Sequence, residues 1–229
     1  MNKLSIIVPC YNEEKTILLV INEIKQNSVG NYEVIIVDDG STDDTKSILE
    51  SINQENIKIV YHDQNFGKGK AIRTGIEECT GDIILIQDAD MEYSPKDYPV
   101  LLRPFNEAGA DVVYGSRFMG GAGYVRLHFY FHYIANKLLT HFCNLFTNLN
   151  MTDMETGYKV FKSDVIKSIN LRENSFGIEP EITVKLAKKN FKFYEVAVSY
   201  KGRSYAEGKK ITIKDAFWAV YCIIKYRFF

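Results

Sequence analysis

The chain has 229 residues, of which 46% are hydrophobic and 25% are charged, and its formal net charge is −1. This length and composition are typical of a folded globular protein with one large domain or two small ones. The near-neutral charge argues against nucleic-acid binding, and no stretch approaches the ~20 apolar residues that span a bilayer.

The first half of the chain alternates short apolar strands with amphipathic helices. Strands are predicted at 4–8, 33–37, 57–61, 82–87 and 111–114, and helices at 13–26, 41–52 and 69–78. Such alternation implies parallel strands with helices on both faces of the sheet. We therefore expect a mostly parallel α/β sheet flanked by helices, with amphipathic helical segments toward the C-terminus.

An acidic cluster follows the strand at 82–87. Asp88, Asp90 and Glu92 stand at alternate positions, and clustered carboxylates resist burial unless a cation lies among them. Oxygen ligands suit Mg²⁺ or Mn²⁺, which share their coordination with substrate phosphates. The cluster therefore indicates a metal-diphosphate site, although a solvated acidic turn fits these residues equally well.

Residues suited to a nucleotide follow the first two strands. Ligands of open α/β sheets bind at the carboxyl ends of the strands, where Tyr11 could stack on a base and Asp39 could accept from a base N–H. The loop at 65–70 adds two glycines and two lysines before a helix, which makes it a candidate phosphate clamp. A Gly-Lys-Gly stretch is, however, more often only a turn.

Four motifs in chain order resemble those of family 2 glycosyltransferases. They are Ile-Val-Pro-Cys-Tyr-Asn-Glu-Glu at 7–14, Val-Asp-Asp-Gly-Ser-Thr-Asp at 37–43, Asn-Phe-Gly-Lys-Gly at 65–69 and Asp-Ala-Asp at 88–90. The chain is similar, over roughly residues 1–210, to the branch of dolichyl-phosphate mannose synthases and polyprenyl-phosphate sugar transferases. This resemblance implies a GT-A domain at 1–210, inverting transfer, and a C-terminal helix at 211–229 within the same unit.

The resemblance also implies which residues bind the donor. A nucleotide-sugar would be bound by Pro9, Tyr11, Glu13, Asp39, Lys68, Asp88, Ala89, Asp90, Arg203 and Lys209. The metal would be held by Asp88, Asp90 and Glu92, where the family branch commonly has Gln at the third position. The segment 177–181 departs from the family, because it reads Gly-Ile-Glu-Pro-Glu where the synthases can place a Lys.

Arg117 and Asp153 would act on the acceptor. By the same resemblance, Arg117 meets the acceptor phosphate and Asp153 lies near the transfer site. A hydroxyl acceptor needs a general base, for which Asp153 is the candidate. A phosphate monoester has a second pKa near ~6 and is already a nucleophile at neutral pH. With such an acceptor, Asp153 would orient it instead of removing a proton.

Two later segments combine aromatic and basic residues. Residues 126–149 contain no acid, and residues 201–229 hold seven basic residues against two acidic ones. The apolar stripe of the first segment, at helical spacing, is Leu127, Phe131, Ile134, Leu138, Phe142, Leu145 and Leu149. Such segments are typical of helices that adsorb to an anionic membrane, although packing on the core or on a second subunit explains either one.

Together these features predict a metal-dependent inverting glycosyltransferase that uses a GDP- or UDP-sugar. We expect it to act on a polyprenyl phosphate while bound peripherally to the inner face of the cell membrane. The scattered cysteines and the absence of a signal peptide favour a cytoplasmic protein. A transferase acting on a sugar hydroxyl of a growing glycan and a non-catalytic nucleotide-sugar-binding subunit remain alternatives. The sequence leaves open the sugar, the base, and whether a second copy or an integral-membrane subunit is a partner.

Overall fold

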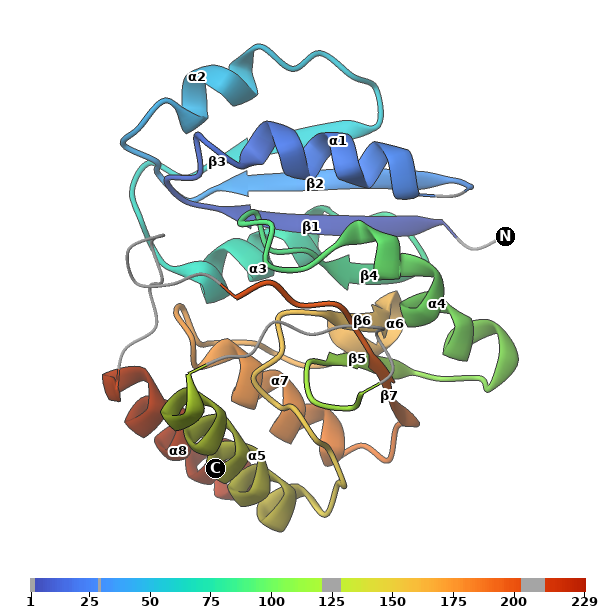
Figure 1. The fold of residues 1–229 in the computed structure, drawn as a ribbon, viewed down its shortest axis with the longest axis vertical. Coiled ribbons are helices and arrows are strands. Elements are labelled where there is room, and N and C mark those ends of the chain that lie inside the picture. The colour runs from blue at the N-terminus through green and yellow to red at the C-terminus, as the bar shows by residue number, and fades with distance from the viewer. Residues whose placement is uncertain (1–2, 29, 121–128, 203–212) are drawn as a thin grey trace.

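A computed structural model describes residues 3–28, 30–120, 129–202 and 213–229 (Figure 1). In these ranges the strands form one seven-stranded sheet in the order β3-β2-β1-β4-β6-β5-β7. The strands are β1 (Leu4–Cys10), β2 (Tyr32–Asp38), β3 (Ile57–Tyr61), β4 (Ile83–Ile86), β5 (Val112–Ser116), β6 (Lys159–Lys162) and β7 (Phe193–Ala197). All neighbours pair in parallel except at β6, which runs antiparallel to both β4 and β5.

Helices cover both faces of the sheet. They are α1 (Ile17–Asn27), α2 (Thr45–Glu50), α3 (Lys68–Glu78), the 3₁₀ turn η1 (Pro95–Asp97), α4 (Tyr98–Glu107), α5 (Tyr130–Thr147), α6 (Ser163–Lys167), α7 (Ile178–Ala187) and α8 (Ile213–Phe228). Because strand side chains alternate between faces, Ile7 packs with α3, α5, α7 and α8 in one core cluster. Ile6 and Val8 pack with α1, α2 and α4 in the other.

The architecture confirms the predicted fold class, with differences at particular elements. The helix expected from Glu13 begins at Ile17, because Glu13 N donates to Thr45 Oγ1 (2.9 Å) and residues 13–16 form a turn instead. The antiparallel strand β6 was not expected, since it is only four residues long and begins with a buried lysine, Lys159. The β7 strand was not expected either.

The C-terminal helix is part of the packed structure. Cys222, Ile223 and Tyr226 of α8 belong to the same buried cluster as residues of α5 and α7, and α5 and α8 lie side by side (Figure 1). Across the described ranges, no helix combines the length and the apolar character that crossing a bilayer requires.

At the amino ends of the central strands, the carboxylate of Glu33 in β2 hydrogen-bonds to β1 and to the residues just before β4. It accepts hydrogen bonds from Lys3 Nζ (2.7 Å), Ser5 Oγ (2.6 Å) and Thr80 N (2.7 Å). Burial opposes its charge, but these donors outweigh burial and lower the pKa of Glu33 from 4.5 to about 2.

We predict that Glu33→Gln lowers the free energy of unfolding at pH 7 by about 1–3 kcal/mol, because three donors lose a charged acceptor. With a pKa that is lower in the folded state, this stabilisation is present above pH 4.5 and is lost as the pH falls through about 2. Urea unfolding at pH 7, 4 and 3 measures it, with the exposed Glu55→Gln as control. A difference between parent and variant that stays constant down to pH 3 would contradict the assignment.

Candidate active site

The carboxyl ends of β1 and β2 meet at one edge of the sheet. Cys10 pairs in register with Asp38, and the backbone N–H of Asp39 donates to the Cys10 carbonyl (2.8 Å). The following loops are tied together, because Asn12 N donates to Ser41 Oγ at 2.9 Å. Both turns use left-handed backbone, with φ of 53° at Asn12 and 70° at Gly40.

Asp39 is a buried carboxylate that organises the next loop. It accepts from Phe66 N (3.1 Å) and Gly67 N (2.7 Å) and lies 2.6 Å from His62 Nδ1. It therefore fixes the backbone just before Lys68, a role that the sequence did not reveal. His62 was not among the predicted site residues, and a lone histidine after a strand gives no signal of such a contact. That Asp39 reads the base stays a prediction.

The other residues predicted for the nucleotide pocket occupy the same edge. Pro9 is half-buried at the end of β1, and Tyr11 follows it, also half-buried. The buried Glu13 accepts from Thr16 Oγ1 at 2.8 Å. Ala89 is 3% exposed and packs in the core, so its methyl group serves packing.

Lys68 lies at the centre of an ion-pair cluster. It is the first residue of α3, and its Nζ lies 2.9 Å from Asp88 Oδ1 and 3.2 Å from Glu179 Oε1. Burial disfavours the ammonium charge, but attraction to Asp88 and Glu179 outweighs burial and raises the pKa of Lys68. The predicted phosphate loop, the predicted metal cluster and the segment 177–181 are thus joined through one side chain.

Glycines allow these loops to approach so closely. A β-carbon at Gly157 would overlap Asp88 Oδ2, and one at Gly67 would overlap the Asn174 carbonyl oxygen. Gly67 also has φ of 100°, a conformation that L side chains rarely adopt. Gly157 N donates to Tyr93 Oη (2.9 Å), which fixes the Asp153–Lys159 stretch against the acidic loop.

Arg117 and Asp153, the predicted acceptor residues, form a two-pronged ion pair. Arg117 Nε donates to Asp153 Oδ2 and its NH2 group donates to Oδ1, both at 2.7 Å. The backbone N–H of Arg117 also reaches Oδ2 (3.0 Å). Asp153 is completely buried, and its charge, outweighing the opposing effect of burial, raises the pKa of Arg117. Asn136 of α5 borders this pair, since its amide oxygen accepts a hydrogen bond from the Arg117 NH2 group at 2.8 Å.

The acidic residues do not gather into one three-carboxylate site. Within the described ranges, no group of three or more His, Cys, Asp or Glu side chains could hold a metal ion. Asp88 is paired with Lys68, and Glu92 accepts from Tyr200 Oη at 2.7 Å. Asp88 and Asp90 still fit a divalent cation that takes its other ligands from water and a diphosphate. Glu92 as a third ligand stays a prediction.

Two predicted donor-binding residues, Arg203 and Lys209, lie outside the described residues, as does Leu127 of the apolar stripe. The role of Arg203 and Lys209 in binding the donor is therefore left as a sequence-based expectation.

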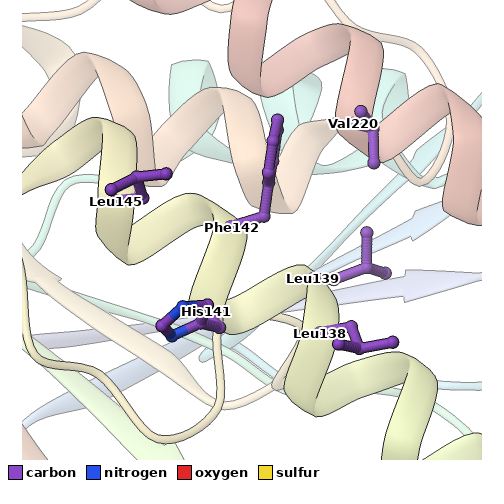
Figure 2. Close-up of a pocket in the computed structure, with 6 residues that line it drawn as sticks. All are labelled: Leu138, Leu139, His141, Phe142, Leu145 and Val220. Atoms are coloured by element: carbon purple, nitrogen blue, oxygen red, sulfur yellow. The ribbon is translucent and has the colours of Figure 1, made fainter.

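An apolar groove of about 330 Å³ lies between α5 and α8. Figure 2 shows its lining, which comprises Leu138, Leu139, His141, Phe142 and Leu145 of α5 and Val220 of α8. It begins one residue beyond Lys137, whose Nζ donates to the Thr152 carbonyl (3.0 Å) next to Asp153. The same helix thus borders both the Arg117–Asp153 pair and the groove.

Known proteins resemble this chain in sequence over most of its length. The uncharacterized protein MJ0544 of Methanocaldococcus jannaschii is 30% identical, over 90% of this chain and 93% of its own length. The dolichol-phosphate mannosyltransferase of Pyrococcus furiosus is 27% identical over 91% of this chain, which spans only 60% of that relative.

A solved structure shares the fold. Glucosyl-3-phosphoglycerate synthase from Mycobacterium tuberculosis, in complex with Mn²⁺, UDP and phosphoglyceric acid, superposes with a TM-score of 0.75 at 19% identity. The match covers 99% of this chain and 79% of that one. The model of Glycosyl transferase family 2 matches residues 5–169, most of the chain. The chain therefore belongs to Glycosyl transferase family 2 and is a glycosyltransferase.

Proposed function

We propose that this enzyme transfers a sugar, with inversion, from a nucleotide-sugar to a polyprenyl phosphate at the cytoplasmic face of a membrane. The observation that carries the choice of acceptor is the ion pair between Arg117 and Asp153. Both Asp153 oxygens accept from the Arg117 guanidinium, so neither takes a proton from an incoming hydroxyl without disrupting the pair. A phosphate acceptor needs no such base, and Asp153 then serves to aim Arg117 at it.

Donor binding follows from the edge of the sheet. Tyr11 offers a ring for the base, and Lys68 offers a cation for the diphosphate. Asp39 already accepts from the backbone at Phe66 and Gly67, so it would read a base N–H through the remaining acceptor capacity of Oδ2. Asp88 and Asp90 would hold Mg²⁺ or Mn²⁺, which when bound offsets the charge of the diphosphate as it departs. The related fold from Mycobacterium tuberculosis binds Mn²⁺ together with UDP, which supports a metal and a uridine nucleotide here.

A lipid acceptor agrees with the surroundings of Arg117. The relative from Pyrococcus furiosus takes its name from dolichol phosphate. The apolar groove begins two residues beyond Asn136 on the same helix, α5. The helix that borders Arg117 thus also carries a hydrocarbon-compatible surface, which a soluble sugar acceptor does not require.

The exposed aromatic residues of α5 and α8 support membrane adsorption. Phe131 is 82% exposed, and Leu145 and Phe217 are each 74% exposed. Large apolar side chains are seldom left in water in such numbers without a binding surface to cover them. The exposed Lys214 and Arg227 add positive charge on α8, which suits anionic lipids.

We predict that Asp88→Asn and Asp90→Asn each lower the rate of sugar transfer at least about 100-fold, because the leaving diphosphate loses its charge compensation. Each variant should also lose the rise in melting temperature that Mn²⁺ and a nucleotide-sugar give the parent. A thermal-shift panel of UDP- and GDP-sugars with Mn²⁺ measures binding and identifies the donor. The control is Asp164→Asn, an exposed residue of α6. An Asp90→Asn variant that transfers or hydrolyses donor as fast as the parent would show that the metal assignment is wrong.

We predict that a triple variant, with alanine at Phe131, Leu145 and Phe217, binds anionic phospholipid vesicles at least about tenfold more weakly than the parent. Each substitution removes apolar side-chain area from the proposed membrane contact. Co-sedimentation with the vesicles measures the binding. The control is Leu18→Ala with Leu19→Ala, which removes two exposed leucines from α1 on the opposite face of the sheet. Unchanged vesicle binding in the triple variant would rule out this surface as the membrane contact.

A further inference from the structure

Two buried carboxylate oxygens have no hydrogen-bond partner among the described residues. They are Oε1 of Glu155 and Oε2 of Glu179. Glu179 is only 5% exposed, and its other oxygen is held by Lys68. A buried acceptor without a donor destabilises the protein that carries it. Such groups are rare in folded proteins, and each calls for an explanation such as a ligand.

The two carboxyl groups are close enough for their charges to interact, although they lie 24 positions apart in the sequence. Burial raises the pKa of Glu155, and the nearby charge of Glu179 raises it further. The Lys159 ammonium group donates to the carbonyls of Met154 (2.9 Å) and Thr156, and neither orphan oxygen is among its partners. Two unsatisfied acceptors thus come from separate segments whose carboxyl groups interact electrostatically.

Glu181, on the same helix, is a buried carboxylate whose two oxygens are both hydrogen-bonded within the protein. Its oxygens accept from Arg172 N (2.8 Å), Glu173 N (2.7 Å) and Lys185 Nζ. Glu181 therefore meets its hydrogen-bonding needs within the protein. Glu179, two residues earlier, leaves one oxygen for a ligand.

We propose that Glu155 and Glu179 bind hydroxyl groups of the sugar being transferred and so determine which sugar is accepted. The inference rests on the proposed function, since it places the donor diphosphate at Asp88. The Lys68 ammonium group contacts both Asp88 and Glu179. This group therefore lies between Glu179 and Asp88, the carboxylate proposed to hold the metal on the donor diphosphate. The sugar is bonded to that diphosphate, which brings its hydroxyls to this depth of the site.

The chemistry of the pair suits a polyol. Sugar hydroxyls donate to the Glu179 carboxylate, and hydrogen bonds with a charged acceptor are stronger than those between neutral groups. Glu155, whose pKa is raised to about 8, is mostly a neutral carboxyl at pH 7, which accepts through one oxygen and donates through the other. Because a site built to pair a hydroxyl leaves its own polar groups unpaired when that hydroxyl is displaced, two such acceptors discriminate between epimers. The orphan oxygens are thus an expected property of the free enzyme.

The test compares Glu155→Gln and Glu179→Gln with Glu181→Gln as the matched control. Melting temperature is measured without ligand, and affinity is measured with Mn²⁺ for UDP, GDP, UDP-glucose, UDP-galactose, UDP-N-acetylglucosamine and GDP-mannose. The kcat/KM ratio between epimeric donors is measured alongside. For Glu155→Gln we expect an unchanged or higher melting temperature, because an unpaired buried acceptor is replaced by an amide. For Glu179→Gln we expect no such rise, because the variant also loses the ion pair with Lys68. The Glu181→Gln protein should melt lower while keeping the parent's donor preference.

For the site variants we expect affinity for the free nucleoside diphosphate to stay within about twofold of the parent. The kcat/KM for the preferred sugar-nucleotide should fall at least about tenfold, and the preference between epimers should narrow. Parent-like epimer preference in both site variants would overturn the inference while leaving the proposed function intact. A parent protein that binds and turns over none of these donors would instead overturn the proposed function.

Discussion

The ion pairs of Lys68 hold the candidate site together. Its ammonium group lies 2.9 Å from Asp88 and 3.2 Å from Glu179, so one positive charge joins the start of α3, the end of β4 and the start of α7. Carboxylates brought together at a buried edge repel one another unless cations compensate. In the described residues Lys68 compensates Asp88 and Glu179, and Arg117 compensates Asp153. A metal bound with the donor would add positive charge beside Asp88, where the diphosphate brings further negative charge.

The same region is physically linked to the surface proposed to meet the membrane. The Glu173 carboxylate accepts from Trp218 Nε1 (2.9 Å) and Lys225 Nζ (3.0 Å) of α8. The next residue, Asn174, accepts from Lys70 N (3.1 Å) in the first turn of α3. One short segment thus connects the C-terminal helix to the helix that begins with Lys68. Adsorption of α8 to a membrane would therefore occur on an element that also supports the donor site.

Local pattern was sufficient to predict the parallel half of the fold. The apolar strands and their intervening helices up to Glu78 have strong periodicity, and the acidic, glycine-rich and aromatic residues after them mark the ligand edge. The β6 strand could not be predicted, because its first residue is a lysine whose charge is accommodated by tertiary contacts, namely carbonyls of the preceding loop and the ring of Tyr114. The helix expected from Glu13 starts later because Thr45, far along the chain, holds that turn.

The sequence motifs marked candidate site residues, but they did not reveal the contacts that those residues make in the folded protein. Arg117 and Asp153 were each marked by local sequence, but their mutual pairing was not. His62 beside Asp39 and Glu179 beside Lys68 leave no trace in spacing, since each contact joins different segments of the fold. At Glu92 the alternate acidic positions suggested one cluster, but they gave no sign that Tyr200 donates to this carboxylate. Its role as a third ligand stays a prediction.

The acceptor class is the central claim, and one assay decides it. The parent protein is supplied with Mn²⁺ and the donor that stabilises it most, together with either a polyprenyl phosphate or a soluble sugar. Because both oxygens of Asp153 are engaged by Arg117, the account predicts a glycosyl phosphate product with the lipid and little transfer to the soluble sugar. Full activity on the soluble sugar, with none on the lipid phosphate, would contradict it.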